Sequence, residues 1–166
     1  TFGWAMDPHL NVCEDGRCRP AALRMSPEQY RRVFTDPRLL DGPAMRAAAR
    51  RRSPSDRVCN AGISSAVLTS EGDILPCPLL QEPLGNVTRG PFAEQWRSSE
   101  RRRRIASITW ADLDRCATCD LMPWCVRCHG AARNEDGDML GPSSVACAAA
   151  EARRDAVENA PDPDDP

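Results

Sequence analysis

The stretch CATCDLMPWCVRC, residues 116–128, holds four cysteines separated by two, five and two residues. A C-x-x-C pair stands at each end of it, and such a pair in a tight turn points two sulfur atoms at one ion or cluster. One pair of this kind is a weak signal. Two pairs so close together, with further cysteines elsewhere in the chain, strongly indicate a metal or iron–sulfur site.

Three more cysteines complete an ordered set of seven. Cys59 and Cys77 stand eighteen positions apart, and Cys147 is alone near the predicted start of the last helix. A predicted hairpin returns the chain to its starting point and so brings Cys59 and Cys77 together. With Cys13 and Cys18 the chain has 9 cysteines, an odd number that cannot all pair as internal disulfides. Metal binding is therefore favoured over disulfide bonding.

A structural zinc site is the alternative to iron–sulfur clusters. Zinc sites normally separate their two C-x-x-C pairs by a dozen residues or more, whereas five residues lie between Cys119 and Cys125. Closing one tetrahedral zinc site with all four cysteines of 116–128 is sterically awkward, so we interpret them as ligands of two centres. Seven cysteines nearly supply the eight ligands of two four-ligand clusters. A zinc-stabilised binding module without redox activity stays open as the alternative.

The composition describes a loop-rich protein with a thin core. Of the 166 residues 41% are hydrophobic but only 5% are aromatic, and there are 15 prolines and 10 glycines. Such a chain needs additional cross-links to be stable, and metal-bound cysteines can supply them. The net charge of −2 predicts neither a nucleic acid nor an anionic membrane as partner. No apolar run reaches the ~18 residues of a membrane span and no signal peptide is visible, so we expect a cytoplasmic protein.

Local signals predict a few helices and one hairpin. The first helix has an N-terminal signature in Ser26, Pro27 and Gln29, with an N-cap, a proline at the first position and a capping-box partner. Helices are predicted over the segments 27–36, 38–52 and 91–105. Ser143 or Ser144 is predicted to cap a last helix that runs to about Asn159. The hairpin is predicted from runs of β-type residues around a turn that contains glycine: 65–69, 70–73 and 74–75. Gly85-Asn86 is predicted to form another turn, and the stretch from 108 to 141 to have little regular structure.

The cysteine pattern resembles the SPASM domain of radical S-adenosylmethionine (SAM) enzymes that modify peptides or mature sulfatases. That family has a cysteine, a glycine about a dozen residues later and a cysteine five positions after the glycine, which match Cys59, Gly72 and Cys77. It continues with the cysteine cluster matched by 116–128 and ends with a lone cysteine, matched by Cys147. Family members also carry a Gly-Asn pair followed by a helix with a Phe…Trp pair: here Gly85, Asn86, Phe92 and Trp96.

Two departures from the family pattern matter. The last close pair is usually separated by three residues, whereas Cys125 and Cys128 are separated by two. The chain also lacks the C-x3-C-x2-C motif that holds the SAM-cleaving cluster, since Cys13 and Cys18 are four residues apart. The chain begins at Thr1 rather than Met. We therefore expect a fragment of a radical SAM oxidoreductase or peptide maturase that is inactive by itself.

The resemblance, which covers about residues 54–150, implies a loop-rich α+β fold. A small β-hairpin and several helices would be organised around two iron–sulfur clusters. The C-terminal remnant of a radical SAM partial (β/α) barrel would precede them. The expected division is residues 1–53 for the end of the barrel and its connecting helices, 54–160 for the SPASM auxiliary-cluster domain, and 161–166 for a disordered acidic tail.

The same resemblance implies two auxiliary [4Fe–4S] clusters and divides the seven cysteines between them. The first cluster would be bound by Cys59, Cys77 and Cys128. The second would be bound by Cys116, Cys119, Cys125 and Cys147. The first set lacks a fourth protein ligand, and only Ser64 and Ser65 stand near Cys59 in the sequence. We expect an open iron there, with Cys18 as the less favoured fourth ligand.

In the full enzyme, the resemblance implies that SAM is cleaved at a third [4Fe–4S] cluster and that a radical abstracts hydrogen from a peptide or protein. The two auxiliary clusters would accept an electron or bind that substrate, and a peptide-recognition domain is a further expected partner. His129 follows a cysteine ligand and could bind iron, but we favour a place beside the cluster or at the surface. Trp110 and Trp124 are expected to cover the clusters from water.

Overall fold

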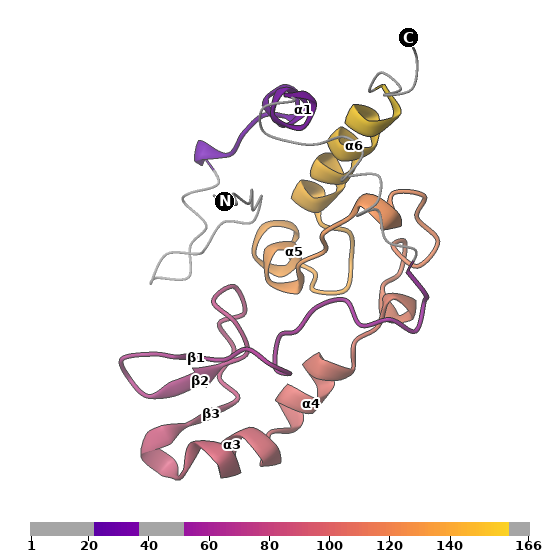
Figure 1. Cartoon of the computed structure of the whole chain (residues 1–166). Coiled ribbons are helices and arrows are strands. Elements are labelled where there is room, and N and C mark those ends of the chain that lie inside the picture. Colours follow the sequence, from indigo (N-terminus) through magenta and orange to yellow (C-terminus); the bar gives the residue numbers. More distant parts are fainter. Residues whose placement is uncertain (1–21, 37–51, 160–166) are drawn as a thin grey trace, which may run out of the picture.

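The structure is a computed structural model that describes residues 22–36 and 52–159 (Figure 1). It is an α+β fold with a three-stranded antiparallel sheet in the order β1-β2-β3. The α-helices of the described residues are α1 (Pro27–Thr35), α3 (Phe92–Ser98), α4 (Glu100–Ser107), α5 (His129–Asp136) and α6 (Ser144–Glu158). The strands are β1 (Val67–Leu68), β2 (Asp73–Leu75) and β3 (Gly85–Asn86). The short 3₁₀ helices are η2 (Val87–Arg89), η3 (Trp110–Asp112) and η4 (Met122–Trp124).

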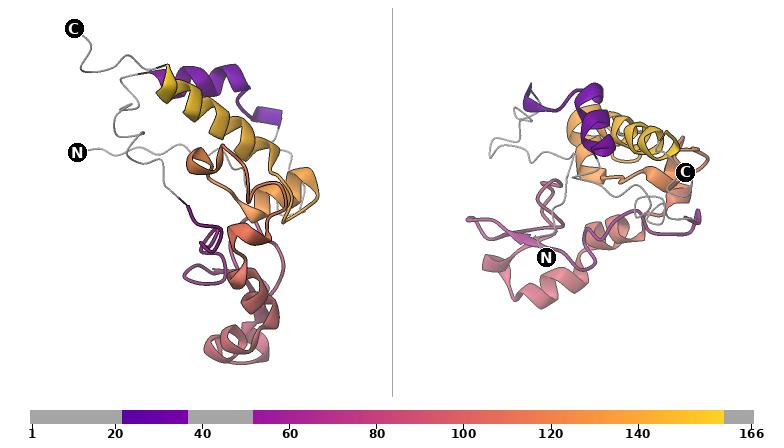
Figure 2. Two further views of the ribbon diagram at one scale, coloured as in Figure 1. Left: turned by 90° about the vertical axis from the view of Figure 1, so that its right-hand side faces the viewer. Right: turned by 45° about the horizontal axis from the view of Figure 1, so that its top comes forward.

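The two ends of the molecule differ in architecture. The sheet, α3 and α4 lie at one end, α1 and α6 lie side by side at the other, and α5 lies between them (Figures 1 and 2). One core cluster at the sheet end contains Ile74, Leu80 and Ile105. A second, nearer the middle, contains Trp110 and Leu113 and extends to α6. The cysteine-rich loops run through both clusters.

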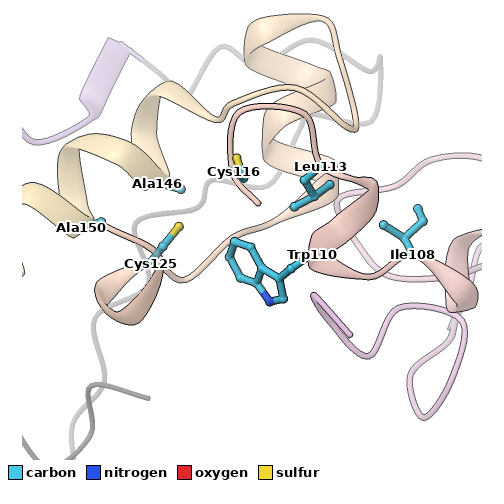
Figure 3. Packing of buried hydrophobic residues seen from close by; sticks show 7 residues of the cluster. All are labelled: Ile108, Trp110, Leu113, Cys116, Cys125, Ala146 and Ala150. Atoms are coloured by element: carbon cyan, nitrogen blue, oxygen red, sulfur yellow. The ribbon is translucent and has the colours of Figure 1, made fainter. Parts of the chain in front are cut away.

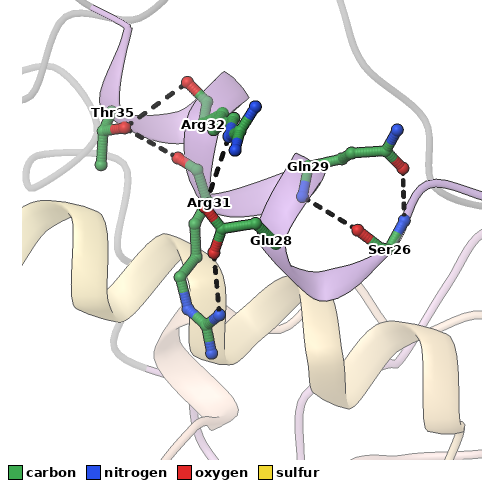
Figure 4. A network of polar contacts seen from close by, with 6 residues as sticks. All are labelled: Ser26, Glu28, Gln29, Arg31, Arg32 and Thr35. Atoms are coloured by element: carbon green, nitrogen blue, oxygen red, sulfur yellow. Dashed lines mark hydrogen bonds and ion pairs between the residues drawn. The ribbon is translucent and has the colours of Figure 1, made fainter.

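Helix α1 begins as its sequence predicts. The Ser26 hydroxyl accepts from the backbone N–H of Gln29 at 3.2 Å, and the Gln29 side chain accepts from the backbone N–H of Ser26 at 2.7 Å (Figure 4). This capping box and Pro27 satisfy or remove backbone donors that the first turn leaves without partners. Tyr30 and Phe34 are buried against Ala152 and Ala156 of α6. The helix therefore holds the N-terminal segment to the C-terminal helix.

The predicted hairpin is confirmed, whereas the turn predicted at Gly85-Asn86 is wrong. Strands β1 and β2 pair with Val67 opposite Leu75, around a turn in which Gly72 has φ +84°. Gly85 and Asn86 form β3, which pairs with β2 so that Asn86 lies opposite Asp73. The Asn86 side chain donates to the Asp73 carboxylate at 2.8 Å and ties the two strands together. The same side chain then accepts from the backbone N–H of Thr88 and begins η2.

The single helix predicted over 91–105 is two helices. The chain leaves the helical conformation at Ser99, whose hydroxyl accepts from the backbone N–H of Arg102 and caps α4. The predicted pair of Phe92 and Trp96 is confirmed, with stacked rings 5.6 Å apart. Arg102 lies over the Trp96 ring and donates to the Gly62 carbonyl at 3.1 Å, so it links α4 to the loop after Cys59.

Sequence reasoning missed α5 and identified α6. Helix α5 begins directly after Cys128 and buries four small or polar residues in succession: His129, Gly130, Ala131 and Ala132. Helix α6 begins after Ser143, as predicted, and ends before Asn159. Cys13, Cys18, most of the predicted helix over 38–52 and the acidic tail lie outside the described residues. No helix in the described segments is both long and apolar enough to span a membrane.

Candidate functional site: two groups of cysteines

Four cysteines line one small cavity, called here the four-cysteine cavity. Cys116 and Cys119 lie in the loop that follows η3. Cys125 ends η4, and Cys147 lies in the first turns of α6. The other residues that line the cavity are Trp110, Leu121, Met122, Arg127, Ser143 and Ala146. The cavity therefore collects both halves of the 116–128 motif and a cysteine from a distant helix.

The backbone of residues 116–128 forms successive turns, so that Cys116, Cys119 and Cys125 line the same cavity. The N–H of Cys119 donates to the Cys116 carbonyl at 3.3 Å, that of Met122 to the Cys119 carbonyl at 3.0 Å, and that of Cys125 to the Met122 carbonyl at 3.2 Å. Figure 3 shows Cys116 and Cys125 around the indole of Trp110, with Ala146 of α6 nearby. Trp110 is only 1% exposed, so its ring shields this side of the cavity from water.

Burial raises the pKa of two thiols of the cavity, Cys125 and Cys147. Cys116 and Cys125 are each 8% exposed. Burial, with the nearby Cys147, raises the pKa of Cys125 to about 11. The pKa of Cys147 is raised by burial first and then by Cys116 and Cys119. Each thiol therefore disfavours a negative charge on its neighbours, and this repulsion is relieved when positive iron binds all of them.

Three further cysteines form a second group, called here the three-cysteine group. Cys59 precedes the hairpin, Cys77 follows it and Cys128 precedes α5. Burial raises the pKa of Cys128, and Cys77 and Cys59 raise it further. The pKa of Cys59 is also raised by burial, with a contribution from Cys77. Cys59 and Cys77 pack against the same core cluster, and both act on the pKa of Cys128.

Backbone N–H groups serve the three-cysteine group as hydrogen-bond donors. The N–H of Ala131, in the first turn of α5, donates to the sulfur of Cys128 at 3.4 Å. A hydrogen bond from the Ala61 backbone lowers the pKa of Cys59 against the larger effect of burial. The chain after Cys59 is held to the end of the hairpin by the N–H of Gly62, which donates to the Pro76 carbonyl at 3.3 Å.

Arg127 lies between the two groups as a buried cation. Its side chain is 4% exposed, and its terminal nitrogens donate to the carbonyls of Cys128 at 2.6 Å, Met139 at 2.9 Å and Gly141. Its charge acts on both groups, because it offsets a small part of the rise that burial causes in the pKa of Cys59 in one and of Cys125 in the other. Sequence reasoning named this residue only as part of a motif, since nothing local predicts that it is buried.

The donor set of the two groups consists of cysteine thiols, the ligands that hold iron–sulfur clusters. All seven cysteines of the two groups are free thiols. In the part of the chain that the structure describes, no three His, Cys, Asp or Glu side chains lie close enough together to hold one metal ion. A [4Fe–4S] cluster is bound by four cysteine thiolates, the number that the four-cysteine cavity brings together. The four-cysteine cavity has a volume of about 20 Å³, about one water molecule, so its thiols must move apart to surround a cluster.

The other residues singled out from the sequence take mixed positions. His129 is buried, and its Nδ1 lies 3.3 Å from the Met139 carbonyl. Burial lowers its pKa and keeps it neutral. The Ser65 hydroxyl donates to the Pro76 carbonyl at 3.0 Å, so it is already engaged beside the three-cysteine group. Trp124 is half-buried and packs against the core cluster that contains Cys116 and Cys125.

Comparison with known proteins agrees with the cysteine pattern. Residues 59–129 match the SPASM family model, described as an iron–sulfur cluster-binding domain. This segment is similar to the SPASM domain. An AdoMet-dependent heme synthase of Nitratidesulfovibrio vulgaris is 32% identical over 84 residues, which are 51% of this chain. The chain matches 23% of the length of that relative. No solved structure matches the chain.

The SPASM match ends at residue 129 and therefore contains six of the seven cysteines of the two groups. Cys147 lies beyond the match and reaches the four-cysteine cavity only through the fold, because α6 returns along the loop that holds the other three. Ser143, which also lines this cavity, was expected from the sequence only as a helix cap. A hydroxyl next to a predicted helix start gives no sequence signal for such a role.

Proposed function

We propose that this chain binds two [4Fe–4S] clusters, one at each cysteine group, as the auxiliary-cluster part of a radical SAM enzyme that modifies a peptide or protein. The observation that carries the proposal is the separation of seven free thiols into a group of three and a group of four. Each group draws its members from segments far apart in the sequence. The SPASM match and the similarity to an AdoMet-dependent enzyme support it.

The protein's own residues would bind and shield the clusters. When bound, such clusters supply one-electron transfer or an iron site for a substrate atom. Trp110 excludes water from the four-cysteine cavity, and the half-buried three-cysteine group is the more open of the two. This group has three thiols and its neighbour Ser65 is already engaged, so a four-ligand cluster there would take its fourth ligand from elsewhere. We therefore assign substrate or thiol binding to the first cluster and electron storage to the second.

A second candidate substrate comes from the relative. Its name places it in heme synthesis, so a heme precursor is an alternative to a peptide for the complete enzyme. The two are separated by supplying the full-length gene product with SAM and either a tetrapyrrole or a peptide encoded near the gene. The substrate that increases SAM cleavage is the one the enzyme uses.

Metal content tests cluster binding directly. The chain, reconstituted anaerobically with iron and sulfide, is expected to hold about eight irons and to absorb near 400 nm (roughly, for sulfur-to-iron charge transfer). Cys116→Ala and Cys59→Ala should each retain about four irons, and each should lose a different electron paramagnetic resonance (EPR) signal. Cys18→Ala is the control and should keep about eight. A colourless wild-type protein that binds zinc instead would contradict the proposal.

A further inference from the structure

Two buried hydrogen-bond donors without partners line the four-cysteine cavity. The Ser143 side chain is 0% exposed, and its hydroxyl has no hydrogen-bond partner. It stands at the N-cap position of α6 but makes no capping hydrogen bond. The Nε–H of Arg127 is also buried and without a partner. Both residues line the same cavity as the four thiols.

Leaving such donors without partners is costly. A buried donor that loses its partner destabilises a protein by about 1–3 kcal/mol, and more when it is charged. Native proteins therefore pair nearly all of them. Arg127 cannot turn its Nε–H elsewhere, because carbonyl oxygens hold both of its terminal nitrogens. Its guanidinium plane is thereby fixed, and its Nε–H has no partner.

Sulfur atoms are the acceptors that this cavity offers. Neutral thiols accept hydrogen bonds weakly. Thiolates bound to iron and the sulfides of a cluster carry negative charge, and donors to charged acceptors form stronger hydrogen bonds. The two donors have no partner in the cavity as it stands, and the sulfur atoms of a bound cluster would supply acceptors for them.

We propose that Ser143 and Arg127 donate hydrogen bonds to sulfur atoms of the cluster held by Cys116, Cys119, Cys125 and Cys147, and that they raise its reduction potential above that of the first cluster. This inference rests on the proposed function. Adding one electron makes the cluster more negative, so donors and a nearby cation stabilise the reduced form more than the oxidised form. The second cluster therefore holds the electron once it is reduced.

Ser143 is the sharper probe of the two donors. Arg127 acts on cysteines of both groups, whereas Ser143 lines the four-cysteine cavity. Ser143→Ala removes the hydroxyl alone. Ser144→Ala is the matched control, because Ser144 is the next residue at the same helix end and is exposed. Ser143→Thr keeps a hydroxyl and should restore the property that Ser143→Ala loses.

The test is a dithionite titration of the anaerobically reconstituted full chain, followed by the EPR signal of each cluster. For Ser143→Ala we expect a more negative potential of the second cluster, an unchanged first cluster and an unchanged iron content. Ser143→Thr and Ser144→Ala should keep the wild-type potentials. In the iron-free chain, Ser143→Ala should leave the thermal midpoint unchanged or raise it, because it removes an unsatisfied buried hydroxyl.

Several results would overturn the inference. One is an unchanged reduction potential of the second cluster in a Ser143→Ala chain that still binds about eight irons. A second is an equal shift in the reduction potentials of both clusters. A third is a lower thermal midpoint of the iron-free Ser143→Ala chain, which would show that the hydroxyl stabilises the fold itself. If Ser143→Ala loses the second cluster altogether, Ser143→Thr must regain both the iron and the potential. A wild-type chain without iron would instead contradict the proposed function itself.

Discussion

The two cysteine groups obtain their hydrogen-bond donors from different parts of the protein. In the three-cysteine group, backbone N–H groups of Ala61 and Ala131 serve the sulfurs of Cys59 and Cys128. Around the four-cysteine cavity, the spare donors are side chains, those of Ser143 and Arg127. A site served by the backbone tolerates changes of side chain but depends on how the chain is packed. A site served by side chains can be altered by one substitution.

The four-cysteine cavity also depends on α6, which carries Cys147 and rests on α1. We expect Phe34→Ala to cost about 3 kcal/mol, because it removes a buried ring from between the two helices. Arg153 would also lose its place over that ring, 4.9 Å from the centroid. For a chain of this size the thermal midpoint should fall by about 6–12 °C.

Differential scanning calorimetry of the cluster-loaded chain measures this change. Leu23→Ala is the control, because Leu23 is 87% exposed and should shift stability by less than about 0.5 kcal/mol. In Phe34→Ala, the EPR signal of the second cluster should weaken more than the EPR signal of the first cluster. Equal losses at both clusters would show that the α1–α6 contact does not act on Cys147 in particular.

Gly130→Ala tests the three-cysteine group through its backbone. A Cβ at this position would overlap the Cβ of Leu79 and lie 2.7 Å from its carbonyl oxygen. Leu79 follows Cys77 closely and Gly130 follows Cys128, so relieving the overlap moves two ligand segments apart. We expect a loss of about 2 kcal/mol in stability and a weaker first cluster, measured by iron content and EPR.

Gly137→Ala is the matched control for that variant. Nothing lies within 4 Å of a Cβ at Gly137, whose φ is +81°. The substitution should therefore cost about 1 kcal/mol in backbone strain and leave both clusters intact. If Gly130→Ala retained about eight irons and wild-type spectra, the packing of α5 on Leu79 would not govern the first site.

Local sequence determined some elements of the fold and not others. Helix α1 could be predicted because Ser26, Pro27 and Gln29 act on one another within a single turn. The strand at Gly85 could not, because Asp73, from another strand, holds the Asn86 side chain. Helix α5 gave no signal, since its buried face consists of a histidine, a glycine and two alanines rather than large apolar residues.

The candidate site shows the same division. Cysteine spacing predicts which residues are ligands, because sulfur chemistry belongs to the residue type. It does not predict that Arg127 is buried between the groups or that Ser143 lacks a capping partner. Both properties arise where α6 and the loop around Met139 and Gly141 close over the motif. Only the folded chain reveals the donors that distinguish one cysteine group from the other.

The smallest expected effect is a difference between the iron-free and the cluster-loaded chain in how their stability depends on pH. The pKa of Cys125 rises from 9.0 to about 11 on folding, so the folded chain holds this proton more tightly than the unfolded chain. The resulting stability is complete below pH ~9 and is lost as the pH approaches ~11. At pH ~9.5 the loss from this thiol is about 1 kcal/mol.

Thermal midpoints of the iron-free chain at pH ~7.5 and ~9.5 measure this loss. Cys125→Ala should flatten the profile more than Cys59→Ala, because the backbone N–H of Ala61 offsets part of the effect of burial on the pKa of Cys59. The loaded chain should show no such loss, since its thiols are already deprotonated and bound to iron. An identical profile for the loaded and iron-free chains would mean that these thiols do not bind iron, and the contrast between the two groups would lose its chemical basis.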